Sequence, residues 1–150
     1  METKVHFSSA SVEWSTPQEL FDQLNQEFQF TLDPCASDQN HKCDKWYTAE
    51  QNGLKQQWDG ERIFCNPPYG RSVSHWVKKC FNEVYNGKCH LAVMLLPART
   101  DTKWFHDYIY HKSEIRFLRG RIRFGNMNQN APFPSMVVIF RRAGYENRTG

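Results

Sequence analysis

The sequence predicts one α/β domain built on a mainly parallel, twisted sheet with helices on both faces. Helical and strand-like patterns alternate along most of the chain, which is typical of such sheets. Residues 90–96 form a nearly continuous apolar run, as expected of a strand buried on both faces. The length of 150 residues, with 39% hydrophobic and 15% aromatic residues, fits a single core. We therefore expect residues 1–150 to form one domain.

The first helix is predicted to begin at Thr16. Thr16-Pro17-Gln18-Glu19 reads as a capping box, with Thr16 as the N-cap and Pro17 at the first helical position. Apolar residues then recur at helical spacing, namely Leu20, Phe21, Leu24 and Phe28.

The second helix is predicted between Ser72 and Gly87, and a third helix is predicted to begin near Thr100 or Asp101. The second carries one apolar stripe, formed by Val73, Trp76, Val77, Cys80, Phe81 and Val84. The third carries a shorter one, formed by Trp104, Phe105, Tyr108 and Ile109.

Strands are predicted between and after these helices. The first ends on a carboxylate, Asp33, and Pro34 stops it, while the third is cut off by Pro67 and Pro68. The expected strands cover residues 28–33, 45–48, 62–66, 90–96, 114–118, 121–124 and 136–140.

Two classes of location are excluded by composition. The longest apolar stretch, 91–97, is far below the roughly 20 residues of a membrane-spanning helix. The polar start Met1-Glu2-Thr3-Lys4 is unlike a secretory signal. We expect a soluble cytoplasmic protein.

The five cysteines indicate neither disulfides nor a metal. Their number is odd and no CxxC pair occurs among Cys35, Cys43, Cys65, Cys80 and Cys89. His41, Cys43 and Cys35 could supply three ligands, but their spacing matches no common zinc module. Buried, reduced thiols and no bound metal are expected.

Charge is unevenly distributed around a net value of +3. Residues 1–75 carry six Lys or Arg against eleven Asp or Glu, whereas residues 76–150 carry thirteen against five. A basic half favours an anionic partner, most often nucleic acid, although a solvated charged face would look the same.

Nucleotide sites built on glycine-rich loops are excluded. The first glycine of the chain is Gly53, so no GxGxxG can follow the first strand. Gly120 and Gly125 have the spacing of a phosphate-binding loop, but Asn126 stands where that loop needs a lysine.

The tetrapeptide Asn66-Pro67-Pro68-Tyr69 is the most specific chemical signal. Its prolines fix the backbone and donate no hydrogen bonds, so carbonyl oxygens are available beside the Asn66 oxygen. Acceptors next to the Tyr69 ring suit a planar group that carries an NH₂, such as a nucleobase with an exocyclic amine. A plain Pro-Pro turn with a packed tyrosine is the alternative.

The tetrapeptide resembles the fourth motif of S-adenosylmethionine-dependent amino-methyltransferases. The wider pattern is similar to the small phage DNA adenine methyltransferases of the Dam type. It runs through Trp14-Ser-Thr-Pro17, Phe28-Gln-Phe-Thr-Leu-Asp-Pro-Cys-Ala-Ser37, Asn52-Gly-Leu54, Trp58, Ile63-Phe-Cys-Asn-Pro-Pro-Tyr-Gly70, Trp76, Leu95-Leu-Pro-Ala-Arg99, Trp104-Phe-His106 and Ala131-Pro-Phe-Pro-Ser135.

The resemblance implies a compact Rossmann-like methyltransferase fold and methylation of adenine in DNA, in the host cytoplasm if the protein is phage-encoded. The flipped adenine would stack near Tyr69, and its amine would donate to the Asn66 side chain and the Pro67 carbonyl. The implied catalytic set is Asn66, Pro67, Pro68 and Tyr69. Methylation of cytosine N4, or a non-catalytic DNA-binding protein that keeps the fold, remain alternatives.

The resemblance also implies a set of residues that bind S-adenosylmethionine. Asp33 would pair with the methionine ammonium, or alternatively only cap a turn. Asn52 would meet the cofactor adenine and Glu50 its ribose, unless both are ordinary polar loop residues. The implied set is Thr16, Pro17, Asp33, Pro34, Cys35, Ala36, Glu50 and Asn52.

Two departures from larger methyltransferases bear on DNA binding. Asp-Pro-Cys-Ala-Ser replaces a glycine-rich cofactor loop, and only 33 residues separate Asp33 from Asn66, so the sheet must be shortened. There is no room for a separate target-recognition domain, so short loops or a second subunit must contact DNA.

The basic C-terminal segment is the expected DNA surface. Strand alternation would place Arg119, Arg121 and Arg123 on one face toward phosphates, and Arg99 is a further candidate. Amides of residues 125–130 are expected either to read base edges or to form a plain polar loop. Arg116, Arg141 and Arg142 lie in or beside the same terminal strands.

Overall fold

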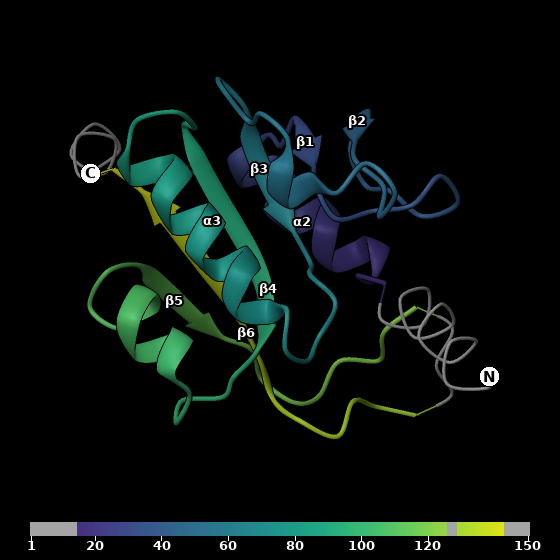
Figure 1. Cartoon of the computed structure of the whole chain (residues 1–150). Helices are drawn as coiled ribbons and strands as arrows, with labels where there is room; N and C mark the ends of the chain where they lie inside the picture. Colours follow the sequence, from purple (N-terminus) through teal and green to yellow (C-terminus); the bar gives the residue numbers. More distant parts are fainter. Residues whose placement is uncertain (1–14, 126–128, 143–150) are drawn as a thin grey trace.

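The computed structural model describes residues 15–125 and 129–142, which contain one six-stranded sheet (Figure 1). The strand order is β2-β1-β3-β4-β6-β5. β2, β1, β3 and β4 run parallel, whereas β6 is antiparallel to both of its neighbours. This confirms the α/β class. The strands are β1 (Leu32–Asp33), β2 (Lys45–Trp46), β3 (Arg62–Cys65), β4 (Leu91–Pro97), β5 (Glu114–Phe117) and β6 (Ser135–Arg141).

Successive residues of the central strands contribute to two separate apolar clusters, as the alternation of side chains along a strand requires. One cluster contains residues of α2 (Gln18–Phe28), and the other contains residues of α3 (Val73–Tyr85) and of the π-helical turn η2 (Phe105–Ile109). In β3, Phe64 belongs to the α2 cluster and Ile63 to the α3 cluster. All seven residues of β4 are buried, which confirms the prediction for this strand.

The predicted strand 28–33 is wrong in its first half. Phe28 is the last residue of α2, and only Leu32–Asp33 pairs as a strand. Gln29 adopts a left-handed backbone (φ 55°), and Asn25 accepts hydrogen bonds there from the N–H groups of Gln29 and Phe30, both at 2.8 Å. This cap ends the helix, so that the Phe30 ring packs against the Phe28 ring at the helix end rather than beside it on one face of a strand.

Two further elements differ from the predictions. The third helix is present but starts slightly later than expected. Residues 103 and 104 are helical and continue into η2, the Thr102 hydroxyl accepts from the Phe105 N–H at its start, and His111 follows its end with φ 65°. Residues 121–124 form no strand: the Ile122 carbonyl oxygen accepts from the Ala131 N–H at 2.7 Å, and Phe124 is buried in the α2 cluster.

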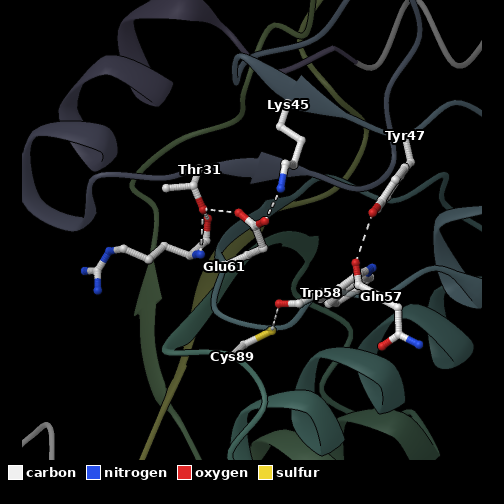
Figure 2. Close-up of polar contacts among 8 residues, drawn as sticks. Thr31, Lys45, Tyr47, Gln57, Trp58, Glu61 and Cys89 are labelled. Atoms are coloured by element: carbon white, nitrogen blue, oxygen red, sulfur yellow. Dashed lines mark hydrogen bonds and ion pairs between the residues drawn. The ribbon is translucent and has the colours of Figure 1, made fainter.

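Polar contacts tie together the amino ends of three strands (Figure 2). Glu61, just before β3, accepts a hydrogen bond from Thr31, just before β1, at 2.7 Å. It also pairs with Lys45 at the start of β2. These contacts lie at the amino ends of the parallel strands. The loops with the predicted site residues lie at the opposite, carboxyl ends. No helix in 15–125 or 129–142 is long and apolar enough to cross a bilayer.

Candidate active site

The loops that carry the predicted site residues lie at one end of the sheet. Leu32 is level with Ile63, and Cys65 is level with Met94, so the carboxyl ends of β1, β3 and β4 are adjacent. Pro97, the last residue of β4, pairs with Ser135, the first residue of the antiparallel β6. The segment that joins β5 to β6 therefore ends at the same edge. Loops at this edge are the usual place for a ligand in an open α/β sheet.

Asn66 leaves β3 at this edge and contacts the start of α2. Its Nδ2 donates a hydrogen bond to Oγ1 of Thr16 at 3.0 Å. With the amide nitrogen used as this donor, Oδ1 is the acceptor end of the side chain. Thr16 is only 4% exposed. The predicted capping box is wrong, because the N-cap position is Pro17 and no side chain caps the helix.

The rest of the Asn66 turn is anchored through Tyr69. Its hydroxyl donates to the carbonyl oxygen of Leu95 in β4 at 3.2 Å. Its ring packs edge-on against Phe133 and Phe124, with ring centres 5.5 and 6.0 Å away. Burial raises the pKa of Tyr69, so the hydroxyl stays protonated. Tyr69 is thus a fixed, half-buried ring rather than an acid or base, while Pro67 is buried and Pro68 exposed.

Asp33 ends β1 as a buried carboxylate, 5% exposed. Burial raises its pKa to about 7, against the opposing effect of hydrogen bonds from the N–H groups of Lys42 and Cys35. The Lys42 N–H lies 3.0 Å from Oδ2. Within the described ranges, no Lys or Arg side chain forms an ion pair with this carboxylate. The hydrogen bond from the Lys42 N–H shows that Asp33 caps the turn after β1. Because no Lys or Arg of the described ranges pairs with this carboxylate, a bound cation would be a favourable partner for its ionised form.

The loop after Asp33 lies against the turn that contains Asn52. A methyl group built on Gly53 would lie 2.0 Å from the carbonyl oxygen of Pro34. Asn52 has a left-handed backbone (φ 57°), and its side-chain oxygen accepts from the Leu54 N–H at 3.2 Å to start the short helix η1 (Gly53–Lys55). Glu50 is exposed on the same turn. The structure therefore brings the 33–36 loop and the 50–53 turn together.

Cys35 and Ala36 complete the 33–36 loop. Cys35 is half-buried, and burial raises the pKa of its thiol, so it is not a thiolate. The Ala36 N–H donates to the carbonyl oxygen of Tyr47 at 2.9 Å, which ties the loop to the residue after β2. All five cysteines are free thiols, four of them buried. The described residues contain no group of His, Cys, Asp and Glu arranged to hold a metal ion.

The basic segment contacts the site directly. Arg119, Arg121 and Arg123 are exposed, while Ile122 between the last two is partly buried and Phe124 after them is buried in the α2 cluster. The three arginines are therefore exposed, but they do not lie on a strand, and Gly120 between the first two is exposed as well. The Gly125 N–H donates to the carbonyl oxygen of Ser15 at 2.9 Å, next to Thr16.

Arg99 follows β4 at the same edge and is exposed. Its guanidinium lies 5.7 Å from the ring centre of Phe133.

Two other arginines of the basic half are held in ion pairs. Arg116 binds both carboxylate oxygens of Glu27 at 2.7 Å and also pairs with Glu114. The hydrogen bond from Arg116 lowers the pKa of Glu27. Arg141 pairs with Glu114 as well. These ion pairs connect α2, β5 and β6. The arginines at 119–123 are therefore the more accessible positive charges of the basic half.

A family model described as DNA N-6-adenine-methyltransferase (Dam) matches residues 5–148. The chain belongs to this Dam family. A DNA N-6-adenine-methyltransferase of Haemophilus phage HP1 (strain HP1c1) is 34% identical over 136 residues, which cover 85% of this chain and 77% of that protein. Another of Escherichia phage T1 is 36% identical over 105 residues, covering 68% of this chain and 42% of that protein.

Sequence reasoning misses three contacts that shape the candidate site of this Dam-family chain. The close approach of Gly53 to Pro34 has only a weak signal, namely a glycine after Asn52 in a segment where a tight turn is expected. The other two contacts join chain segments more than 60 residues apart. They are the hydrogen bond between Ser15 and Gly125 and the packing of Phe133 beside Tyr69. No local pattern reveals such pairs.

Proposed function

We propose that this Dam-family enzyme transfers a methyl group from S-adenosylmethionine to the exocyclic N6 of adenine in DNA. DNA adenine methylation is the activity for which the family and both phage relatives are named. The observation that carries the proposal for this chain is the hydrogen bond from Asn66 to Thr16. It makes Asn66 Oδ1 an acceptor at the start of the Asn-Pro-Pro-Tyr turn, where the target amine needs one.

The Asn66 turn would position the target adenine. The amine donates one hydrogen to Asn66 Oδ1 and the other to the Pro67 carbonyl oxygen, Pro68 keeps the turn rigid, and the base stacks near Tyr69. These contacts would favour a pyramidal nitrogen whose lone pair forms the new N–C bond as the methyl–sulfur bond breaks, and the methylated amine would then release one proton to solvent. S-adenosylmethionine, when bound, would supply the methyl group on its sulfonium sulfur, and the C–S bonding electrons would leave with the neutral thioether, which is a good leaving group. Catalysis is mainly positioning with stabilisation of developing charge.

Asp33 would hold the methionine ammonium of the methyl donor. A buried carboxylate with a raised pKa and no Lys or Arg partner in the described ranges fits such a cation. The adjoining turn would contact the rest of the cofactor, with Asn52 toward the adenine and Glu50 toward the ribose. The proposed cofactor set is Pro17, Asp33, Pro34, Cys35, Ala36, Glu50 and Asn52. Thr16, which the resemblance also implies for this set, is given a different role below.

We propose that DNA lies across Arg99 and the basic segment, contacting Arg119, Arg121 and Arg123. These residues are exposed, and their segment touches Tyr69 through Phe124 and Phe133. A single Rossmann-like domain with helices on both faces of a shortened sheet would then hold both the reaction and the DNA. A second subunit would be an additional source of DNA contacts. Because the substrate is DNA, the cytoplasm of the host cell is the expected place of action.

Transfer of tritiated methyl groups to unmethylated DNA, followed by nucleoside analysis, tests the function. The expected product is N6-methyladenine, and N4-methylcytosine would instead identify the cytosine enzyme. Asn66→Ala should abolish most of the transfer while it keeps the affinity for S-adenosylmethionine. Tight binding of cofactor and DNA by the wild type without any transfer would identify a non-catalytic DNA-binding protein.

A further inference from the structure

We propose that Thr16 is a positioning residue for methyl transfer rather than a contact to the methyl donor. Its hydroxyl holds the amide nitrogen of Asn66, and this keeps Asn66 Oδ1 turned to accept from the target amine. The inference rests on the proposed role of Asn66 and adds a residue 50 positions away in the sequence.

The backbone on both sides of Thr16 is held by other elements. The carbonyl oxygen of Ser15 accepts from the Gly125 N–H at 2.9 Å, and that of Pro17 accepts from the Phe21 N–H at 3.1 Å. Between these two anchors, the Thr16 side chain is buried and its Oγ1 lies 3.0 Å from Asn66 Nδ2. The position of this hydroxyl is therefore determined by α2 and the basic segment, not by Asn66 itself.

The chemistry of an amide explains why this contact matters. The two ends of the Asn66 side chain are a donor and an acceptor of similar size, and rotation about the last bond exchanges them. A target NH₂ group needs acceptors, and a donor in the same place would leave both groups without a partner. By accepting from Nδ2, Thr16 favours the one orientation that suits the reaction. Valine has nearly the same shape as threonine but offers no acceptor.

The two possible roles of Thr16 give different kinetics. A cofactor contact would raise the dissociation constant for S-adenosylmethionine when it is removed. A positioning contact acts on the orientation of Asn66, so its loss lowers kcat and leaves that dissociation constant unchanged.

Thr16→Val and Thr16→Ser test the proposal, with Thr31→Val as the matched control. Thr31 also uses its hydroxyl in a side-chain hydrogen bond, but at the opposite end of the sheet (Figure 2). We expect Thr16→Val to lower kcat about ten- to a hundred-fold, the range for removing one hydrogen bond to a buried partner. Thr16→Ser should stay within about three-fold of wild type, and Thr31→Val should leave kcat unchanged. Thr16→Ala replaces the valine variant if the latter does not fold.

Binding and NMR measurements distinguish a failure of the proposed role of Thr16 from a failure of the proposed function on which that role rests. The side-chain NH₂ resonances of Asn66, assigned through the Asn66→Asp variant, should shift in Thr16→Val and return in Thr16→Ser. A weaker affinity of Thr16→Val for S-adenosylmethionine, or equal kcat losses in the valine and serine variants, would overturn the positioning role. Full activity of Asn66→Ala would instead overturn the proposed function.

Discussion

Gly53 lies in direct contact with the backbone of Pro34, since a methyl group on Gly53 would come within 2.0 Å of the Pro34 carbonyl oxygen. The Gly53 carbonyl oxygen also accepts from the indole N–H of Trp58 at 3.0 Å, so the turn cannot easily move away. The 33–36 loop and the 50–53 turn are therefore packed as one unit.

Gly53→Ala should displace this unit. We expect a loss of about 1–3 kcal/mol in the free energy of unfolding, as for other overpacked sites, together with weaker binding of S-adenosylmethionine. Urea unfolding and calorimetric titration measure the two effects. Gly60→Ala is the control, because Gly60 has a positive φ of 76° but open space around it. It should lose stability without losing affinity. Unchanged stability and affinity in Gly53→Ala would contradict the packing argument.

Asp33→Ala should weaken S-adenosylmethionine binding by roughly ten-fold to over a hundred-fold. This is the range for removing a charge-assisted hydrogen bond of about 1.5–3 kcal/mol. For the wild type, affinity should rise between about pH 5.5 and 7, because the ammonium favours the ionised carboxylate, whose pKa is about 7 in the free protein. Calorimetric titration at several pH values measures this. Unchanged affinity in folded Asp33→Ala would leave Asp33 with its turn-capping role alone.

Asp33→Asn should stabilise the protein above pH 7. The carboxyl has a pKa of about 7 when folded, against an ordinary value of 3.8, so the folded state holds its proton more tightly. Its contribution to stability is full below pH 3.8 and is lost as the pH rises through 7. The neutral amide avoids that loss. In thermal unfolding, the Tm of the variant should thus exceed that of the wild type by several degrees at about pH 8 and by less at about pH 5. An advantage that is largest at the lower pH would contradict the sign of the shift.

Replacing Arg119, Arg121 and Arg123 together with Ala should weaken DNA binding for every sequence tested. The slope of log affinity against log salt should flatten by about 0.9 for each phosphate that is no longer neutralised. Fluorescence anisotropy across a salt series measures both, and S-adenosylmethionine affinity should not change.

Three exposed cations away from this segment provide the matched control for the arginines, in the variant Lys55→Ala, Lys88→Ala and Lys112→Ala. It removes the same number of charges. Equal losses in both variants would mean that net charge, rather than the 119–123 segment, governs DNA binding. Wild-type affinity in the arginine variant would move the DNA surface toward Lys78, Lys79, Arg99 and Lys103.

Tyr69→Phe should keep most of the methyl transfer, because the ring remains beside Phe124 and Phe133. It should lose about 1 kcal/mol in the free energy of unfolding, since Leu95 loses a hydrogen bond to its buried carbonyl oxygen. Tyr69→Ala should lose transfer as well as stability. A phenylalanine variant that folds but does not turn over would give the hydroxyl a part in the reaction.

The elements with long, unambiguous apolar patterns are the most predictable from sequence. The apolar run at β4 fits only a buried strand, and the apolar stripe at α3 fits only an amphipathic helix. The structure contains both elements. The failures occur where a local pattern fits two structures. Phe28 and Phe30 have the two-residue spacing of one strand face, but the helix ends between them at the left-handed Gln29. Thr16 matches a cap by position, but its hydroxyl bonds to Asn66 instead.

The candidate site is predictable as a set of segments but not as a set of contacts. The rule that ligands bind at the carboxyl ends of parallel strands points to Asp33 and Asn66, which follow the neighbouring strands β1 and β3. It does not indicate that the basic segment reaches Ser15 and Tyr69. That arrangement follows from β6 being antiparallel, which returns the chain to the edge where β4 ends.

The connection between β5 and β6 joins two neighbouring strands of the sheet. Just inside its ends, the Leu118 N–H donates to the carbonyl oxygen of Ser135 at 3.0 Å, so the connection is closed at its base. The entropy of closing such a loop changes only slowly with its length, by about 0.6 kcal/mol for each doubling. A change in the length of this segment should therefore leave the strands beneath it in register.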